Sequence, residues 1–113
     1  MVATMFGRVL EITVEELKAK RARGEACVLL DVREPKEYVI SDLPDSVKIP
    51  LGSLQQSFGT LSREDEIVVY CRSGARSASA VQFLQQMGYE KAKNLQGGIN
   101  AWAERVDPAM ARY

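Results

Sequence analysis

Histidine is absent from the 113 residues of this sequence. Its absence excludes Ser-His-Asp and Cys-His catalysis, imidazole acid–base chemistry and histidine-ligated metals. The two cysteines, Cys27 and Cys71, form no C-x-x-C pair and are too few for a usual structural zinc site or a disulfide framework. We therefore expect no bound metal and no other cofactor.

A surplus of charge is also missing, because 15 basic residues balance 15 acidic ones. This balance predicts no nucleic-acid partner. No apolar run approaches the length of a membrane span, so we expect no membrane partner either. Residues 1–8 lack the apolar core of a signal peptide, which favours a cytoplasmic location. The length suits one domain, residues 1–113.

Strand-like and helix-like segments alternate along the chain. The predicted strands span residues 27–32, 47–49, 66–70 and 92–95. A first predicted helix follows a capping box formed by Thr13 and Glu16, and a second, short one begins at Pro35. Three more predicted helices cover residues 51–58, 78–87 and 99–106. This alternation predicts a three-layer α/β/α fold, with a mostly parallel central sheet of about five strands and helices on both faces.

Cys71 ends the apolar 66–70 segment, and a short polar loop and then a helical pattern follow it. Backbone amides at the start of that helix, the helix dipole and the guanidinium groups of Arg72 and Arg76 can stabilise a thiolate there. We therefore predict that Cys71 is a nucleophile. Ser73 and Ser77 have an alternative reading as caps of the following helix.

Two other predicted strands end in polar or glycine-rich residues. Asp31 and Arg33 lie at the end of one strand, and the segment 96–98 follows another. In open α/β sheets, sites form beyond the carboxyl ends of the strands. We expect Asp31 and Arg33 to brace the cysteine loop by hydrogen bonds, and the Gly97–Gly98 pair to form a tight turn.

Four motifs together resemble the rhodanese family of sulfurtransferases, in that family's order and spacing. They are Asp31-Val32-Arg33-Glu34-Pro35 with Glu37-Tyr38; Ile49-Pro50-Leu51; Val68 to Ser77, with Cys71-Arg72-Ser73-Gly74 and Arg76-Ser77; and Asn94-Leu95 with Gly97-Gly98-Ile99 and Ala101-Trp102. The resemblance runs from about Ile12 to Trp102, nearly the whole chain. The stretch from Ala101 to Tyr113 resembles the end of rhodanese-like domains fused to adenylyltransferases that activate ubiquitin-like sulfur carriers.

The resemblance implies transfer of a sulfane sulfur from thiosulfate or a persulfide donor through a Cys71 persulfide. The acceptor that it implies is a thiol or cyanide, with thioredoxin and a ubiquitin-like sulfur carrier as protein candidates. Arg76 is expected to grip the donor anion, since a guanidinium binds oxyanions bidentately. The donor-binding residues that we predict are Arg72, Ser73, Gly74, Ala75, Arg76 and Ser77.

The chain departs from the family pattern at Asp45, where many members have glycine. Aspartate reaches left-handed backbone angles more readily than most residues, so we expect the loop to tolerate it. Cys27, in an apolar strand, is expected to pack in the core. The acidic residues Glu34 and Glu37 are interpreted as partners of a helix dipole.

Two alternatives to sulfur transfer stay open. A cysteine-dependent phosphatase or arsenate reductase also holds a thiolate in an anion-binding loop. The four residues between Cys71 and Arg76 make this loop tighter than in protein phosphatases of that type. The other alternative is a non-catalytic interaction module with the same fold.

Overall fold

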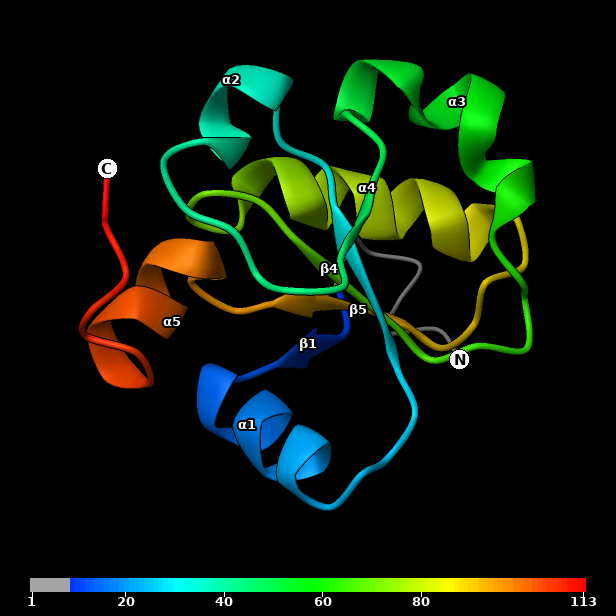
Figure 1. The fold of residues 1–113 in the computed structure, drawn as a ribbon. Coiled ribbons are helices and arrows are strands. Elements are labelled where there is room, and N and C mark those ends of the chain that lie inside the picture. The colour runs from blue at the N-terminus through cyan, green and yellow to red at the C-terminus, as the bar shows by residue number, and fades with distance from the viewer. Residues whose placement is uncertain (1–8) are drawn as a thin grey trace.

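A computed structural model describes residues 9–113 of the chain. Its five strands form one sheet in the order β1-β5-β4-β2-β3, and all neighbouring strands are parallel (Figure 1). The strands are β1 (Glu11–Ile12), β2 (Val28–Asp31), β3 (Val47–Lys48), β4 (Ile67–Tyr70) and β5 (Ala92–Leu95). The expectation drawn from residues 1–8 lies outside the described residues.

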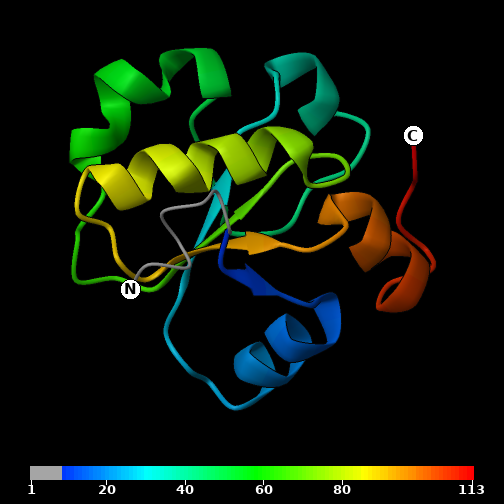
Figure 2. The same cartoon turned by 180° about the vertical axis from the view of Figure 1, so that it is seen from behind.

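Helices cover both faces of the sheet. They are α1 (Val14–Ala22), α2 (Pro35–Tyr38), α3 (Leu54–Ser57), α4 (Ala75–Gln86) and α5 (Gly98–Arg105), with the short 3-10 helices η2 (Leu51–Ser53) and η3 (Phe58–Thr60) on either side of α3. Both views show α1 and α5 on one side and α3 and α4 on the other (Figures 1 and 2). The predicted three-layer α/β/α fold is confirmed. Within residues 9–113, no helix is long and apolar enough to cross a membrane.

The apolar β4 strand is buried on both sides at the centre of the sheet. Alternate side chains of a strand point to opposite faces. Accordingly, Ile67 and Val69 pack in the core under α4, whereas Val68 and Tyr70 pack in the core under α1 and α5. All four side chains are inaccessible to solvent, which explains why this segment has no polar residue.

The edge strand β1 has no counterpart among the predicted strands. Glu11 and Ile12 pair with Asn94 and Leu95 of β5. A strand of two residues is too short to show a hydrophobic period of two, so only the pairing with β5 reveals it.

Local signals at the ends of elements behave as the sequence indicates. Thr13 and Glu16 form the predicted capping box, in which each side chain accepts a hydrogen bond from the other residue's amide. Gly24 and Gly88, just beyond α1 and α4, adopt the φ angles of 72° and 93° that favour glycine. Asp45 has a φ of 68°, which confirms that aspartate replaces glycine at a left-handed position.

Because all strands are parallel, their carboxyl ends meet along one edge of the sheet. Asp31 ends β2, Cys71 follows β4, and Gly97 follows β5 by two residues. The structure therefore brings together the three strand ends that the sequence singles out.

Candidate active site

The sulfur of Cys71 lies at the N-terminus of α4. Its Sγ accepts hydrogen bonds from the amides of Gly74 at 3.1 Å and Ser77 at 3.4 Å, and from the hydroxyl of Ser77 at 3.3 Å. These amides belong to the first turn of the helix, where N–H groups have no partner within the helix itself. The sulfur thus lies beside the N-terminus of the helix that follows the loop. A cysteine that only filled core space would not need three donors.

Two opposing effects set the pKa of the Cys71 thiol. Burial raises it, since the residue is only 1% exposed. The hydrogen bonds from the Ser77 hydroxyl and from the amides of Ser77 and Gly74, together with the nearby Ser73 amide, lower it more, so the pKa lies below that of an ordinary cysteine. The amides and the hydroxyl therefore favour the thiolate, the nucleophilic form of cysteine.

The loop after Cys71 depends on a glycine at its end. Gly74 is the N-cap of α4 and has a φ of 112°. Its carbonyl accepts a hydrogen bond from the Asn94 side chain on β5 at 3.1 Å. The carbonyl oxygen of the Asn94 side chain, Oδ1, also accepts from the Ser77 hydroxyl, whose single proton is therefore shared between Oδ1 and the Cys71 sulfur. Neither Ser73 nor Ser77 caps the helix, so the alternative reading of these serines is wrong.

Arg76 forms a two-pronged ion pair with Glu37 of α2. Its Nη1 and Nη2 donate to Oε2 and Oε1 of Glu37 at 2.8 and 2.9 Å. The same carboxylate accepts a bond from the amide of Glu34 at 2.8 Å. The Arg76 guanidinium, followed by the Tyr113 hydroxyl and the Glu34 amide, holds the pKa of Glu37 well below its usual range. Glu37 therefore has a larger role than the helix-dipole interpretation assigned to it.

Arg72 has a different environment. Its guanidinium lies 4.9 Å from the centroid of the Tyr113 ring, in cation–π geometry. Among residues 9–113, no carboxylate forms an ion pair with it. The two arginines of the loop therefore differ, since one is neutralised by a carboxylate and the other rests on an aromatic ring.

Asp31 and Arg33 are fully buried and bind each other. Arg33 donates to the Asp31 carboxylate at 2.8 to 3.2 Å. It also donates to the carbonyls of Glu37 and Ser41 at 3.2 and 2.8 Å, and to the Tyr113 hydroxyl at 3.0 Å. Within the described chain, neither side chain hydrogen-bonds directly to residues 71–77. Their connection to the loop passes through Glu37 and Tyr113.

The turn after β5 hydrogen-bonds to the backbone of the cysteine loop. The amides of Ile99 and Asn100 donate to the carbonyls of Cys71 and Arg72 at 2.9 and 3.1 Å. A Cβ atom on Gly98 would lie only 2.4 Å from the Arg72 carbonyl oxygen. Gly98 is therefore needed for close approach as well as for its φ of 64°.

The sequence did not reveal the roles of side chains that are distant from Cys71 in the sequence but contact its loop in the fold. Tyr113 was noted only within a resembling segment, and Asn94 only as part of a motif. Neither has a fixed spacing from Cys71 that a pattern could show. Cys27 is only partly buried and packs against the core rather than in it, because it precedes the first residue of β2; burial raises its pKa. The closeness of Lys20 and Arg21, which lower that pKa, was not expected.

Comparisons with known proteins agree with this geometry. The family model described as "Rhodanese-like domain" matches residues 13–105. A sulfurtransferase of Allochromatium vinosum is 38% identical over 103 residues, which cover 91% of this chain and 96% of that protein. The adenylyltransferase and sulfurtransferase MOCS3 of Arabidopsis thaliana is 35% identical over 90% of this chain, which matches 25% of that protein. A rhodanese-related protein from Thermoplasma volcanium has a TM-score of 0.79 at 34% identity, covering 86% of this chain and 93% of that one.

Replacing Ser77 with alanine removes the hydroxyl bond to the sulfur, so we expect Ser77→Ala to raise the pKa of Cys71. Only the thiolate is alkylated quickly, and its fraction grows as the pH rises through the pKa. The pH midpoint for iodoacetamide alkylation of Cys71 is then higher in the variant. At neutral pH its rate falls by about fivefold, the value of one hydrogen bond. The control is Ser79→Ala on the exposed face of α4; equal profiles for all three proteins would contradict the role of Ser77.

Replacing Gly98 with alanine forces a methyl group against the Cys71–Arg72 peptide. We expect Gly98→Ala to lower the free energy of unfolding by about 2–4 kcal/mol, measured by urea denaturation. Gly52→Ala is the matched control, because a Cβ there meets nothing within 4 Å. A Gly98→Ala protein as stable as the Gly52→Ala protein would show that the close approach is not a constraint.

Proposed function

Because this chain belongs to the rhodanese-like domain family, we propose that Cys71 accepts a sulfane sulfur from a donor and passes it to a thiophilic acceptor. Its relatives support a sulfurtransferase of the rhodanese type at the family level. The observation that carries the proposal is the group of donors around Sγ, two amides and a hydroxyl within 3.4 Å. These donors can stabilise both a thiolate and a persulfide anion.

The first displacement loads the enzyme. The Cys71 thiolate attacks the outer sulfur of thiosulfate, and a new S–S bond forms at Sγ. The S–S bond of thiosulfate breaks, and its electron pair leaves with sulfite. Sulfite departs as a stable anion and takes up no proton from the enzyme. A site without histidine is therefore sufficient for this step.

The second displacement unloads the enzyme. An acceptor thiolate or cyanide attacks the terminal sulfur of the Cys71 persulfide. The bond to Sγ breaks, its electron pair returns to Sγ, and the thiolate is regenerated for another cycle. Two half-reactions through one covalent intermediate predict ping-pong kinetics.

The loop residues have two proposed tasks. The amides of the segment 72–77 hold the charged sulfur, and Ser77 adds its hydroxyl. Arg76 faces the donor while Glu37 holds its guanidinium in a fixed direction, with 36% of the Arg76 side chain exposed. Arg72 supplies a second positive group at the rim of the loop.

The physiological donor and acceptor follow from chemistry only as classes. The donor is thiosulfate or a persulfide on another protein, and the acceptor is a thiol, cyanide, thioredoxin or a ubiquitin-like sulfur carrier. The carrier is favoured by the resemblance of the stretch from Ala101 to Tyr113 to domains fused to adenylyltransferases, and this chain matches a quarter of the relative named adenylyltransferase and sulfurtransferase. A single domain over residues 1–113 and a cytoplasmic location remain predictions.

Cys71→Ser tests the proposal directly. Wild-type protein incubated with thiosulfate should gain the mass of one sulfur atom, mapped to Cys71 by peptide mass spectrometry. Cys71→Ser should gain none and lose sulfur transfer to cyanide while keeping its thermal midpoint, because serine is not a nucleophile for sulfane sulfur at neutral pH. Cys27→Ser is the matched control and should load normally.

Other outcomes identify the alternatives. A wild-type protein that binds thiosulfate without a gain in mass would indicate an interaction module. Hydrolysis of aryl phosphates without sulfur transfer would indicate a phosphatase.

Arg76→Ala should weaken the use of thiosulfate far more than it lowers stability. The loss of a charge-assisted hydrogen bond to the donor predicts a rise in KM of about tenfold or more. Truncation also leaves Glu37 without its ion-pair partner, so the control is the double variant Glu37→Gln/Arg76→Ala, which carries neither charge. An unchanged KM for thiosulfate in both variants would show that Arg76 does not contact the donor.

A further inference from the structure

The segment that follows α5 brings Tyr113 against the cysteine loop. Figures 1 and 2 both place this segment beside α5, and its end rises toward α2. We infer that Tyr113 is a positioning residue that orients both arginines of the loop, Arg72 through its ring and Arg76 through Glu37. The inference rests on the proposed sulfur transfer and adds to it a group 42 positions (113 − 71) beyond Cys71 in the sequence.

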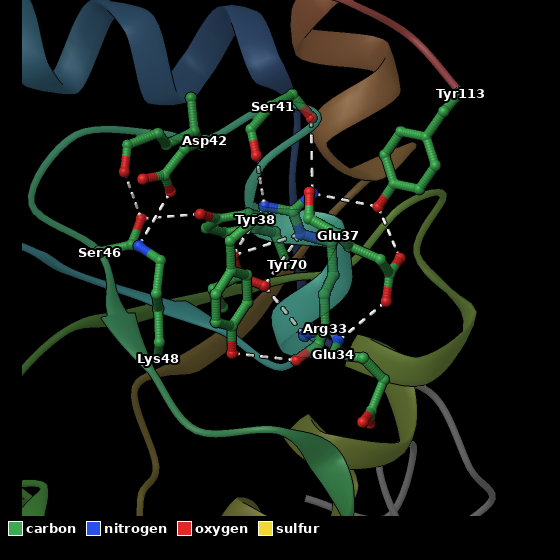
Figure 3. A network of polar contacts seen from close by, with 12 residues as sticks. Arg33, Glu34, Glu37, Tyr38, Ser41, Asp42, Ser46, Lys48, Tyr70 and Tyr113 are labelled. Atoms are coloured by element: carbon green, nitrogen blue, oxygen red, sulfur yellow. Dashed lines mark hydrogen bonds and ion pairs between the residues drawn. The ribbon is translucent and has the colours of Figure 1, made fainter.

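The hydroxyl of Tyr113 connects two ion pairs (Figure 3). It accepts a hydrogen bond from Nη1 of Arg33 at 3.0 Å and donates one to Oε1 of Glu37 at 2.6 Å. Arg33 cannot accept a proton, so its bond makes the hydroxyl direct its own proton to Glu37. Burial, which is the main cause, raises the pKa of Tyr113 and keeps this hydroxyl protonated.

The hydrogen bond from the Tyr113 hydroxyl fixes the Glu37 carboxylate, which in turn binds Arg76. Oε1 of Glu37 accepts from both Tyr113 and Nη2 of Arg76, while Oε2 accepts from Nη1 of Arg76 and from the amide of Glu34. The Glu37 carboxylate is therefore held from three directions. Without the Tyr113 bond, the Glu37 side chain could change rotamer and take the Arg76 guanidinium with it.

The ring of Tyr113 supports the other arginine. The guanidinium of Arg72 lies 4.9 Å from the ring centroid. Asn100 keeps the two residues together, because its amide donates to the Arg72 carbonyl at 3.1 Å and its Oδ1 accepts from the Tyr113 amide at 3.4 Å. Tyr113 also lines, with Ser73 and Asn100, an open surface groove of about 580 Å³ beside the loop. Tyr113 is thus tied to the loop both by its ring and by its backbone amide.

Three variants separate the contacts of Tyr113. Tyr113→Phe removes the hydroxyl and keeps the ring under Arg72, whereas Tyr113→Leu removes both. Tyr89→Phe is the matched control, because it also deletes a tyrosine hydroxyl, one that donates to the Phe58 and Leu61 carbonyls away from the loop. Glu37→Gln and Glu37→Gln/Tyr113→Phe complete a double-mutant cycle.

Two measurements are made on each variant. The first is KM and kcat for thiosulfate with cyanide as acceptor. The second is the ratio of the rates at which iodoacetate and iodoacetamide alkylate Cys71. This ratio reports the positive potential at the sulfur, because the reagents differ in charge, and it requires no sulfur transfer.

We expect Tyr113→Phe to raise KM for thiosulfate about five- to tenfold while kcat changes less than about twofold. The alkylation ratio should fall about threefold, and Tyr113→Leu should lower it by about threefold again through loss of the cation–π contact. In the Glu37→Gln background, Tyr113→Phe should change KM by less than about twofold, because the Glu37 carboxylate to which the Tyr113 hydroxyl donates is already gone. Tyr89→Phe should leave KM and the ratio at the wild-type values.

A Tyr113→Phe protein with the KM and the alkylation ratio of Tyr89→Phe would overturn the inference. Effects of Tyr113→Phe and Glu37→Gln that multiply would also overturn it, since Tyr113 would then not act through Glu37. If wild-type protein gains no sulfur, the proposed function fails, yet the alkylation ratio still tests whether Tyr113 orients the arginines. Tyr113→Phe decides these outcomes even where Tyr113→Leu does not fold, because it retains the ring.

Discussion

The contact of backbone amides with the sulfur of Cys71 is the interaction on which the site depends. Amides at the first turn of α4 provide fixed dipoles, which need no ionisable partner and do not change with pH. Together, the Ser77 hydroxyl and these amides outweigh the burial of the thiol and lower its pKa. The loop can present them only because Gly74 turns the backbone and Gly98 lets a second turn approach the Cys71 carbonyl closely.

The charged side chains near the cysteine loop largely neutralise one another. Asp31 compensates Arg33, and Glu37 compensates Arg76. A buried ion pair lowers the energy of the fold only when its remaining polar atoms are also satisfied. Tyr113 satisfies one atom of each pair, which makes the two pairs a single network. Arg72 is the cation of the loop that no described carboxylate neutralises.

Particular elements show how far a single sequence can be interpreted. The β4 strand was predictable because burial on both faces leaves an uninterrupted apolar run, and α1 was predictable because capping is a contact between neighbours. The left-handed Asp45 followed from the backbone preference of aspartate. The β1 strand was not predictable, since two residues show no period and its stability comes from pairing with β5.

The sequence by itself led to the proposed chemistry, because a chain without histidine that places a cysteine beside a predicted helix N-terminus favours that cysteine as the nucleophile. It also determined the order of the elements, and from that order the edge of the sheet where the strand ends meet. Only the tertiary structure decided the partners of each charge. Glu37 precedes Arg76 by 39 positions and Tyr113 by 76, and no local pattern can register contacts across such separations. They form only when the packing of α2, α4 and the final segment brings these side chains within hydrogen-bond distance.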